Sequence, residues 1–409
     1  MNEYFADLHI HLGRDGRGRP VKISASAGLT VTGVVEECTR RKGIQIAGVV
    51  DCHSPGVLDD LRRLVAGEDA CEDAAGGIRV AGVDGCYSGA GATGADNVTV
   101  ILCSEVEVVV RGARCHLLAY LPTLESMVRF SRWLEPRVTN VTLSSQRCEA
   151  PAGEVVRVAA DLGGLVAPAH VFTPHRGILG ACVTRLGEAF DDRDLEHMPS
   201  VELGLSADTG MADTIDEMSR FSFLSNSDAH SRASIAREYN TLWLEAPSFA
   251  ELLLALRYSG GRRVTANYGL DPRLGKYHRT FCPVCGHVAT GPAPENECTL
   301  CGNARVVLGV WDRVRSIASS YSPVHPHGRP QYMHQVPLAF IPGLGPRSLD
   351  RIIAAFGSEM NALHRASAED LESVVGPILA SRVVAAREGR LQVTVGAGGV
   401  YGSVCDPTG

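Results

Sequence analysis

The fold class of this 409-residue chain is decided by the stretch YFADLHIH, residues 4–11. It is a short apolar run that ends in two imidazoles. Alternate residues of a strand project to the same face, so His9 and His11 point together. Asp7 lies on that face as well, where a carboxylate can orient an imidazole. The stretch therefore predicts a strand whose carboxyl end carries a pair of metal ligands.

The same pattern recurs along the chain, where further apolar runs end in imidazole or carboxylate residues. Mixed nitrogen and oxygen ligands, with no thiolate required, suit Zn, Mn or Fe. Eight candidates are too many for one ion, so they predict two or three metal ions, which can clamp both oxygens of a phosphoryl displacement. The alternative is that these side chains are scattered core or surface groups. Beyond His9 and His11, the candidates are His53, Glu105, His116, His170, Asp228 and His230.

Strand-like and helical patterns alternate up to about residue 260. This alternation predicts an α/β fold with a parallel sheet, and at this length a barrel. The candidate ligands lie at the carboxyl ends of the expected strands, where barrel enzymes place their chemistry. Strands are expected at Tyr4–His11, Ile44–Cys52, Val98–Val110, Arg114–Leu121, Leu165–Phe172, Ser200–Leu205, Phe221–Ser225 and Thr241–Glu245, and helices at Val31–Lys42, Pro55–Ala66, Leu124–Leu134, Gly153–Leu162 and Ser248–Tyr258.

Two glycine-rich segments lack such periodicity. Ala70–Asn97 is rich in Gly, Ala and Asp and is expected to be an extended loop. Gly13–Ser26 follows the first histidine pair and has two readings: a solvated loop, or a cationic lip that meets phosphates at the metal site. Its cations are Arg14, Arg17, Arg19 and Lys22.

Charge is distributed unevenly. Residues 1–261 hold 24 Lys and Arg against 35 Asp and Glu, whereas residues 262–409 hold 15 against 11. An acidic body suits a cluster of metal ligands, and a slightly basic tail suits an anionic polymer. Nine of the 13 cysteines are scattered singly, as in reduced cytosolic proteins. No apolar run of about twenty residues predicts a membrane span. The N-terminus has no signal-peptide layout, so a cytoplasmic location is expected.

Four cysteines form two Cys-x-x-Cys-Gly knuckles twelve residues apart. The glycine bends the backbone around the sulfurs, and four thiolates complete a tetrahedral structural zinc site with no open position. A redox dithiol is the alternative. His278 and His287 flank the quartet and are expected to be bystanders. The quartet is Cys282, Cys285, Cys298 and Cys301.

A second local motif, IPGLGPRSL at residues 341–349, opens a helical run. Its glycines allow a tight turn whose amides, at a helix N-terminus, can bind a phosphate. It resembles the helix-hairpin-helix module, which grips DNA backbones, with a degenerate second copy at Val375–Leu379. A plain helical turn is the alternative. Just before it, Gln335–Phe340 fits the loose pattern of sliding-clamp ligands or is only the entry to the hairpin. The expected DNA contacts are Gly343, Gly345, Arg347 and Arg351.

The histidine and carboxylate motifs, in their chain order, resemble those of the polymerase-and-histidinol-phosphatase (PHP) family. That resemblance implies a distorted seven-stranded (β/α)7 barrel holding two or three divalent cations (Zn, Mn or Mg) that hydrolyses phosphoesters, with Asp228, Glu105 and His170 as catalytic residues. Some assignments stay open. Asp15 is the only candidate soon after the histidine pair, Glu107 competes with Glu105 as the bridging carboxylate, and Asp51 is a candidate orienting residue. His175 is expected near the site without being a ligand.

The barrel, cysteine quartet and hairpin, in this order, resemble the endonuclease Q family over nearly the whole chain. The resemblance implies hydrolysis of the phosphodiester 5′ to deaminated bases (uracil, hypoxanthine, xanthine) and abasic sites, with the damaged nucleotide extruded into the barrel. Glu202 and Asp208 are positional guesses for base contacts. The expected domains are a catalytic barrel (1–275), a zinc ribbon (276–310), a linker (311–335) and a DNA-binding helical domain (336–409).

Two other functions remain open. The barrel by itself permits a small-molecule phosphatase, which would leave the quartet and hairpin unexplained. A non-catalytic DNA-binding repair scaffold would explain those two, but it would be expected to have lost metal ligands.

Overall fold

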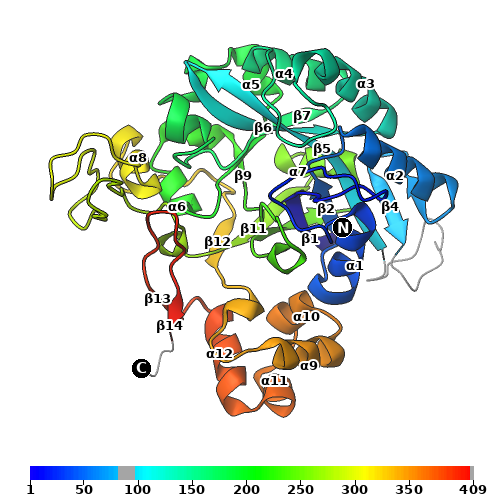
Figure 1. Ribbon diagram of the computed structural model, residues 1–409. Helices are drawn as coiled ribbons and strands as arrows, with labels where there is room; N and C mark the ends of the chain where they lie inside the picture. The colour runs from blue at the N-terminus through cyan, green and yellow to red at the C-terminus, as the bar shows by residue number, and fades with distance from the viewer. Residues whose placement is uncertain (82–96, 406–409) are drawn as a thin grey trace.

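The computed structural model describes residues 1–81 and 97–405. A mixed β-sheet with flanking helices forms the larger part, a small lobe follows β11 (Arg263–Gly269), and the helices from α9 (Pro346–Phe356) to α12 (Pro377–Arg387) gather in a separate lobe (Figure 1). Across the described ranges, no helix has both the length and the apolar character needed to cross a membrane.

The main sheet has the strand order β12-β11-β10-β1-β2-β5-β4-β3, with β6 beside β5 and β7 beside β6. Its centre is apolar on both faces: Leu8, Ile46 and Ile101 belong to one buried cluster, and the alternate residues Ala47 and Val100 belong to another. The strands are β1 (Asn2–Ile10), β2 (Ile46–Val49), β3 (Ala70–Glu72), β4 (Ile78–Ala81), β5 (Asn97–Val110), β6 (Ala113–Leu121), β7 (Leu165–Pro168), β10 (Tyr239–Leu244), β11 (Arg263–Gly269) and β12 (Gln331–His334).

The expected parallel sheet is found at β1, β2 and β5, but β4, β6, β7 and β10 pair antiparallel with their neighbours. The reason at β6 is its connection to β5. Arg111 (φ 49°) and Gly112 (φ 83°) form a two-residue turn, and both have the positive φ that the tight hairpin turn requires. A link this short cannot join parallel strands, which need a crossover of a dozen residues or more.

Loops and a short second sheet close the strands into a distorted barrel. β8 (Ser200–Glu202) pairs with β9 (Ser222–Leu224) in parallel. On one side the Val171 amide donates to the Glu202 carbonyl, and on the other the His11 amide donates to the Ala229 carbonyl. The carboxyl ends of β1, β7 and β9 therefore meet around one opening. This mixed α/β barrel agrees with the expected fold class.

Helices cover the outside of the barrel. α2 and α3 begin and end at the predicted residues, and Thr123 caps α3 by accepting from the Ser126 amide. The barrel helices are α1 (Val31–Glu37), α2 (Pro55–Ala66), α3 (Leu124–Leu134), α4 (Ala152–Asp161), α5 (Asp192–Glu196), α6 (Thr209–Ala212) and α7 (Phe249–Leu256).

Part of the expected loop Ala70–Asn97 is regular structure. Residues 70–72 and 78–81 form the hairpin β3–β4, which extends the sheet from β5. Alternating burial along Ile78–Ala81, with Ile78 and Val80 inside, explains why this stretch is a strand despite its glycine-rich flank. Residues 82–96 of that expected loop lie outside the described residues.

The C-terminal third contains more structure than a ribbon, a linker and a helical domain. The range expected as a linker includes most of α8 (Val310–Ile317) and all of β12, which pairs with β11 in the main sheet. After the helical lobe the chain returns to the barrel. The further elements are α9 (Pro346–Phe356), α10 (Glu359–His364), α11 (Ala368–Val375), α12 (Pro377–Arg387), β13 (Gln392–Val393) and β14 (Val404–Cys405).

Most side chains of the possible sliding-clamp segment, Gln335–Phe340, pack against the rest of the protein. Gln335 is buried and its side chain bonds the hydroxyl of Tyr239, while Val336 and Leu338 are buried in the core. Burial of Gln335 and Leu338 argues against a clamp at this segment, although Phe340, the last residue of the pattern, is exposed. The segment is the entry to the helical lobe.

Candidate metal centre and active site

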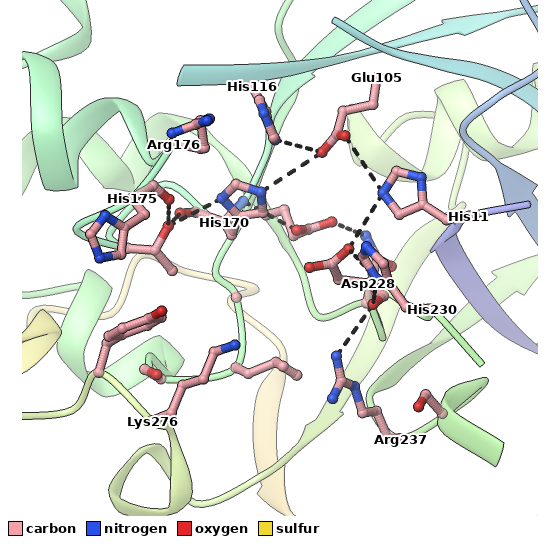
Figure 2. Close-up of a pocket in the computed structure, with 18 of the residues that line it drawn as sticks. His11, Glu105, His116, His170, His175, Arg176, Asp228, His230, Arg237 and Lys276 are labelled. Atoms are coloured by element: carbon pink, nitrogen blue, oxygen red, sulfur yellow. Dashed lines mark hydrogen bonds and ion pairs between the residues drawn. The ribbon is translucent and has the colours of Figure 1, made fainter. Parts of the chain in front are cut away.

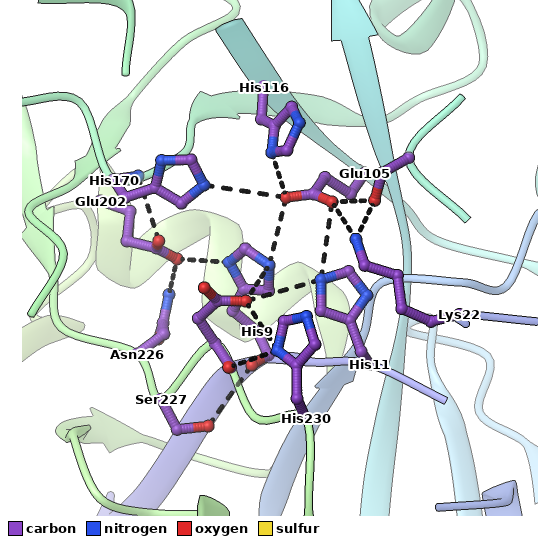
Figure 3. A network of polar contacts seen from close by, with 12 residues as sticks. His9, His11, Lys22, Glu105, His116, His170, Glu202, Asn226, Ser227 and His230 are labelled. Carbon is purple, nitrogen blue, oxygen red and sulfur yellow. Dashed lines mark hydrogen bonds and ion pairs between the residues drawn. The ribbon is translucent and has the colours of Figure 1, made fainter. Parts of the chain in front are cut away.

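Six of the eight candidate ligands gather at the barrel opening from distant parts of the chain (Figure 3). They form two groups, and within each group one nitrogen or oxygen from every side chain lies within 4.8 Å of the others. Each residue lies at or just after the end of a strand, except Glu105 and His116, which lie within β5 and β6 and are diagonal neighbours across that pair. One group is His9, His11 and Asp228, and the other is Glu105, His116 and His170.

Glu105 lies between the two groups. Its Oε1 is 2.7 Å from Nδ1 of His116 and 3.5 Å from Nε2 of His9, and its Oε2 is 3.5 Å from Nε2 of His11. Oδ1 of Asp228 lies 3.5 Å from Nε2 of both His9 and His11. These separations are those of ligands that share an ion with bonds of about 2.0–2.2 Å. Two carboxylates thus face the same imidazoles, as a multinuclear centre requires.

Outer carboxylates orient the first two imidazoles. Nδ1 of His9 contacts Oε2 of Glu202 at 2.9 Å, and Nδ1 of His11 lies 3.2 Å from the carboxylate of Asp51. Both rings therefore turn Nε2 toward the centre, which is how metal-binding histidines are held. Nε2 of His9 is buried and has no hydrogen-bond partner. A buried nitrogen without a partner is costly, and a bound cation would satisfy it.

The electrostatics also suit cations. Burial alone raises the pKa of a carboxyl, but His116 and Lys22 hold the pKa of Glu105 well below its usual range. Burial also acts to raise the pKa of Asp228, but the charges of His9 and His11 outweigh it and lower that pKa. Burial of Asp51 is likewise outweighed by His11, so that its pKa falls to about 2. Three ionised carboxylates thus share a buried site.

Lys22 is the one cation of the Gly13–Ser26 loop that lines the pocket at this centre. Its Nζ lies 3.3 Å from Oε2 of Glu105 and donates to Oγ of Ser145 at 2.5 Å. Its backbone amide bonds the Leu12 carbonyl, which fixes the loop to the end of β1. Arg14 and Arg19 instead bond within their own loop. Lys22 is therefore the cation of this loop that is placed to act as a lip, and its contact with phosphate stays a prediction.

Two of the gathered residues have strained backbone. Asp228 (φ 45°) and His170 (φ 31°) lie in the left-handed region, which residues with a side chain rarely adopt. Such strain costs about 1–3 kcal/mol and is concentrated at functional sites. The positions of these two side chains are therefore imposed by the surrounding fold.

His53 and His230 lie beside the centre without joining either group. Both ring nitrogens of His53 have protein partners, Ser104 Oγ at 2.8 Å and the Leu143 carbonyl at 3.4 Å. The His230 ring packs 4.7 Å from the His11 ring, and its Nδ1 contacts the Asp228 carbonyl at 3.0 Å. His53 in particular has no ring nitrogen left to offer.

Several acidic candidates have other partners. Asp15 accepts from the amides of Arg17 and Arg19, so it holds its own loop together. Glu107 turns outward to Nε of Arg176 at 2.5 Å, which leaves the central position to Glu105. Asp208 caps α6 by accepting from the Met211 amide, an interaction that argues against a base contact.

Asp7 and Glu202 differ from their expected roles. Asp7 accepts from the Ser227 and Ala236 amides at 3.1 and 2.9 Å, so it fixes the Asp228 loop and orients no imidazole. Glu202 was considered only for base contact, yet it orients His9. The sequence signal for Glu202 is an acidic residue within a predicted strand, the same signal that marks Glu105.

The centre forms one side of a pocket of about 490 Å³. His175 lines it without joining the metal groups, as expected. The opposite side carries Lys276, Tyr277 and Tyr401, and Figure 2 shows Lys276 across the cavity from Glu105. The volume suits a nucleotide-sized ligand rather than an ion alone.

The cysteine quartet forms a separate surface site. Sγ of Cys282 lies 3.7 Å from Sγ of Cys301, and Sγ of Cys285 lies 3.5 Å from Sγ of Cys298. A tetrahedron with Zn–S bonds of about 2.3 Å has edges of about 3.8 Å, so the sulfurs fit a zinc ion. Both knuckles turn through a glycine of positive φ, Gly286 and Gly302.

The expected DNA-binding hairpin is a pair of similar turns. Gly345 precedes Pro346 at the start of α9, and Gly376 precedes Pro377 at the start of α12. Gly343 (φ 79°) makes the first turn possible. Arg347 and Arg351 are exposed on α9. The two glycines of the first turn and these two cations are therefore exposed, where a phosphate backbone can reach them.

No family model matches the chain. It is 42% identical over 407 residues to the uncharacterized protein YqxK of Bacillus subtilis, which covers 99% of this chain and all of that protein. The lesion-specific endonuclease PfuEndoQ from Pyrococcus furiosus has a crystal structure with a TM-score of 0.81 and 29% identity, over 99% of this chain and 96% of that one. Endonuclease Q bound to a 27-mer duplex with an abasic lesion at the active site gives the same TM-score and identity, over 99% and 97%.

Proposed function

We propose, from the premise that this chain belongs to the endonuclease Q family, that it is a DNA repair endonuclease that hydrolyses the phosphodiester 5′ to deaminated bases and abasic sites. Uracil, hypoxanthine and xanthine are the proposed bases. One observation carries the proposal. The candidate ligand group of His9, His11 and Asp228 opens into a nucleotide-sized pocket, and the buried Nε2 of His9 has no hydrogen-bond partner.

Two or three divalent cations (Zn, Mn or Mg) are proposed as cofactors of the barrel. When bound, such ions activate water and neutralise phosphate charge. The residues that would hold them are those of the two groups, His9, His11 and Asp228 with Glu105, His116 and His170. One structural zinc is proposed for the cysteine quartet.

The chain's own groups have further roles in this proposal. Glu202 and Asp51 hold the imidazoles of His9 and His11 in the orientation that leaves Nε2 inward. Lys22 places an ammonium beside Glu105 at the pocket, where it can contact a non-bridging phosphate oxygen. Because Lys22 is already held beside Glu105, its charge can offset that of the phosphodiester under attack without any movement of the loop.

The C-terminal part would hold the DNA. The exposed Gly343 and Gly345 let a phosphate backbone approach the turn closely, and Arg347 and Arg351 present charge, so these contacts are to phosphates and read no sequence. Selectivity for damage then depends on extruding the nucleotide, which is easier for a base that pairs and stacks poorly.

Incubation of the purified protein with labelled duplexes tests the proposal. Each duplex carries one deoxyuridine, one deoxyinosine or one abasic analogue, with Mg or Mn present. Cleavage on the 5′ side of the lesion, leaving the lesion on a 5′-phosphate end, is expected, whereas undamaged duplex stays intact. Absence of incision on all three with every metal would refute the nuclease.

The two alternatives have less support. A small-molecule phosphatase leaves the cysteine quartet and the helical lobe without a role, although the similarity to PfuEndoQ covers 99% of the chain. Turnover of a phosphomonoester without DNA cleavage would favour it. A non-catalytic scaffold conflicts with the gathered imidazoles and carboxylates.

A further inference from the structure

One side of the pocket is an aromatic surface built around a lysine. Nζ of Lys276 lies 5.4 Å from the ring centroid of Tyr277 and 5.4 Å from that of Tyr401. All three side chains line the same cavity as Glu105 and Asp228, and Figure 2 shows Lys276 there. The two rings have different surroundings: Tyr277 packs on the core and against the ring of His175, while Tyr401 is 41% exposed.

The last segment of the chain brings Tyr401 to the pocket. After α12 the chain turns back along the barrel, where the Gly396 amide donates to the Arg273 carbonyl at 2.7 Å and the Gly402 amide donates to the Leu274 carbonyl at 2.9 Å. A Cβ at Gly402 would lie 2.0 Å from the Thr394 carbonyl oxygen. Only glycine permits this close approach, so the turn that carries Tyr401 is specified by the sequence.

Arg237 links this tyrosine to the metal centre. Its Nη1 donates to the Tyr401 hydroxyl at 3.4 Å, its Nη2 donates to the Asp228 carbonyl at 3.3 Å, and its Nε donates to the Ser227 carbonyl at 2.7 Å. The hydroxyl end of Tyr401 is thus held at a fixed place relative to the loop that carries Asp228. One face of its ring meets the Lys276 ammonium, and the exposed part of the side chain borders the cavity.

Such a ring suits one kind of ligand. An exposed aromatic ring, fixed at its hydroxyl and bordering a pocket that faces a phosphoesterase centre, offers a π-face to a planar group. Stacking of a base on an aromatic side chain changes affinity by about 5- to 150-fold and tolerates any base. Uracil, hypoxanthine and xanthine differ in their hydrogen-bonding edges but share such a face.

We propose that Tyr401 stacks on the base of the extruded nucleotide, with Lys276 beside it facing the adjoining phosphate. The inference rests on the proposed nuclease function and adds a base-recognising residue. Because Tyr401 comes from the segment after the helical lobe, the same C-terminal part holds the DNA backbone and completes the pocket.

Paired substrates test the inference, because an abasic site has no base to stack. Cleavage of deoxyuridine and abasic duplexes is measured under single-turnover conditions for the unaltered protein, Tyr401→Leu and Tyr401→Phe. Leucine keeps apolar bulk without an aromatic face, and phenylalanine keeps the face without the hydroxyl. For Tyr401→Leu, the ratio of deoxyuridine to abasic cleavage is expected to fall about tenfold or more. Tyr401→Phe should keep most of that ratio.

Tyr321→Leu is the matched control, since Tyr321 is 87% exposed, packs on Arg315 and lies outside the pocket. It should leave both rates unchanged. Equal loss on both substrates for Tyr401→Leu, or no loss on either, overturns the stacking role. Failure of the unaltered protein to cleave either duplex is a different result, since it counts against the nuclease itself.

Discussion

The barrel centre and the two C-terminal sites differ in how far apart their residues lie along the chain. The barrel groups combine residues from His9 to Asp228, whereas the cysteine quartet lies within residues 282–301 and the first hairpin turn within residues 341–346. The barrel centre therefore depends on the whole fold, and each C-terminal site depends on local turns. A substitution in the barrel centre should therefore leave the C-terminal sites intact, and a substitution in a C-terminal site should leave the barrel centre intact.

Burial is the second difference. His9, His11 and Glu105 are almost fully inaccessible, while Cys285 and Cys301 are exposed. Imidazoles and carboxylates buried together are stable only when each is oriented and paired. Glu202 and Asp51 provide that orientation in the barrel, whereas the quartet is only half buried, with Cys282 and Cys298 inside. The barrel centre should accordingly be sensitive to residues that never touch a ligand.

Asp228→Asn gives the largest expected effect. The amide keeps the shape of the side chain but removes the charge that faces His9 and His11 at 3.5 Å. Cleavage of abasic duplex should fall by more than about 100-fold, because even the loss of an outer partner costs 10- to 100-fold. DNA affinity, measured by fluorescence anisotropy, should stay near that of the unaltered protein.

Asp216→Asn is the control for that variant. Asp216 is 75% exposed and pairs with Ser319 and Arg185, away from the pocket. Near-normal cleavage by Asp228→Asn would contradict the assignment of the barrel centre, and loss of DNA binding would contradict its separation from the C-terminal sites.

Glu202→Gln tests the dependence on orienting residues. The amide can still contact Nδ1 of His9 but carries no charge, so metal affinity should fall about 10- to 100-fold. Calorimetric titration of the metal-free protein with Mn measures that change, and excess Mn should restore cleavage. Glu196→Gln, at an exposed position on α5, is the control. Identical titrations for both variants would remove the orienting role.

The same difference in sequence separation explains what could be predicted. Glu105, His116, His170 and Asp228 were identified because each belongs to a strand or follows one, and neighbouring strands bring them to one opening. The quartet was identified because its spacing alone fixes its geometry. For both sites the sequence supplied the residues that gather, and their roles as ligands remain predictions.

Orientation was not predictable, because it depends on contacts between remote residues. Asp7 shares a face with the histidines, yet it bonds the amides of the Asp228 loop. Asp51 orients His11, although His53 is the histidine nearest to it in the sequence. Tyr401 reaches the pocket only because the chain returns past the helical lobe. The antiparallel β6 was readable in principle, since Arg111 and Gly112 leave no room for a crossover.

Cys285→Ser tests the independence of the ribbon. The protein should lose about one zinc per chain by elemental analysis, since the tetrahedral site needs all four thiolates. The melting temperature of the ribbon should fall, and cleavage should drop only a few-fold. Cys71→Ser, on β3 outside the quartet, should keep the zinc. Loss of metal from the barrel as well would contradict the independence of the two sites.

Gly343→Ala should have a smaller effect, confined to DNA binding. Gly343 has φ 79°, and an added Cβ would lie 2.8 Å from Nη1 of Arg382. The strain of about 1–2 kcal/mol should distort the turn and raise the Kd for duplex about fivefold or more, with a shallower salt dependence. Gly187→Ala is the control, because the nearest atom to its added Cβ is 3.9 Å away. Unchanged Kd values would remove the hairpin's assigned role.

The smallest effect concerns stability alone, at a buried acid of the barrel. Burial raises the pKa of Glu238 from 4.5 to about 8, and its Oε2 has no hydrogen-bond partner. Between these pH values the folded protein keeps a proton that the unfolded chain has lost, so the free energy of unfolding falls as pH rises. Glu238→Gln carries no such proton and should flatten that decline. Urea unfolding at pH 5.5 and pH 8 measures it: the variant should gain stability relative to the unaltered protein at the higher pH. An equal difference in stability at both pH values would contradict this prediction, because it would mean that folded Glu238 keeps no extra proton.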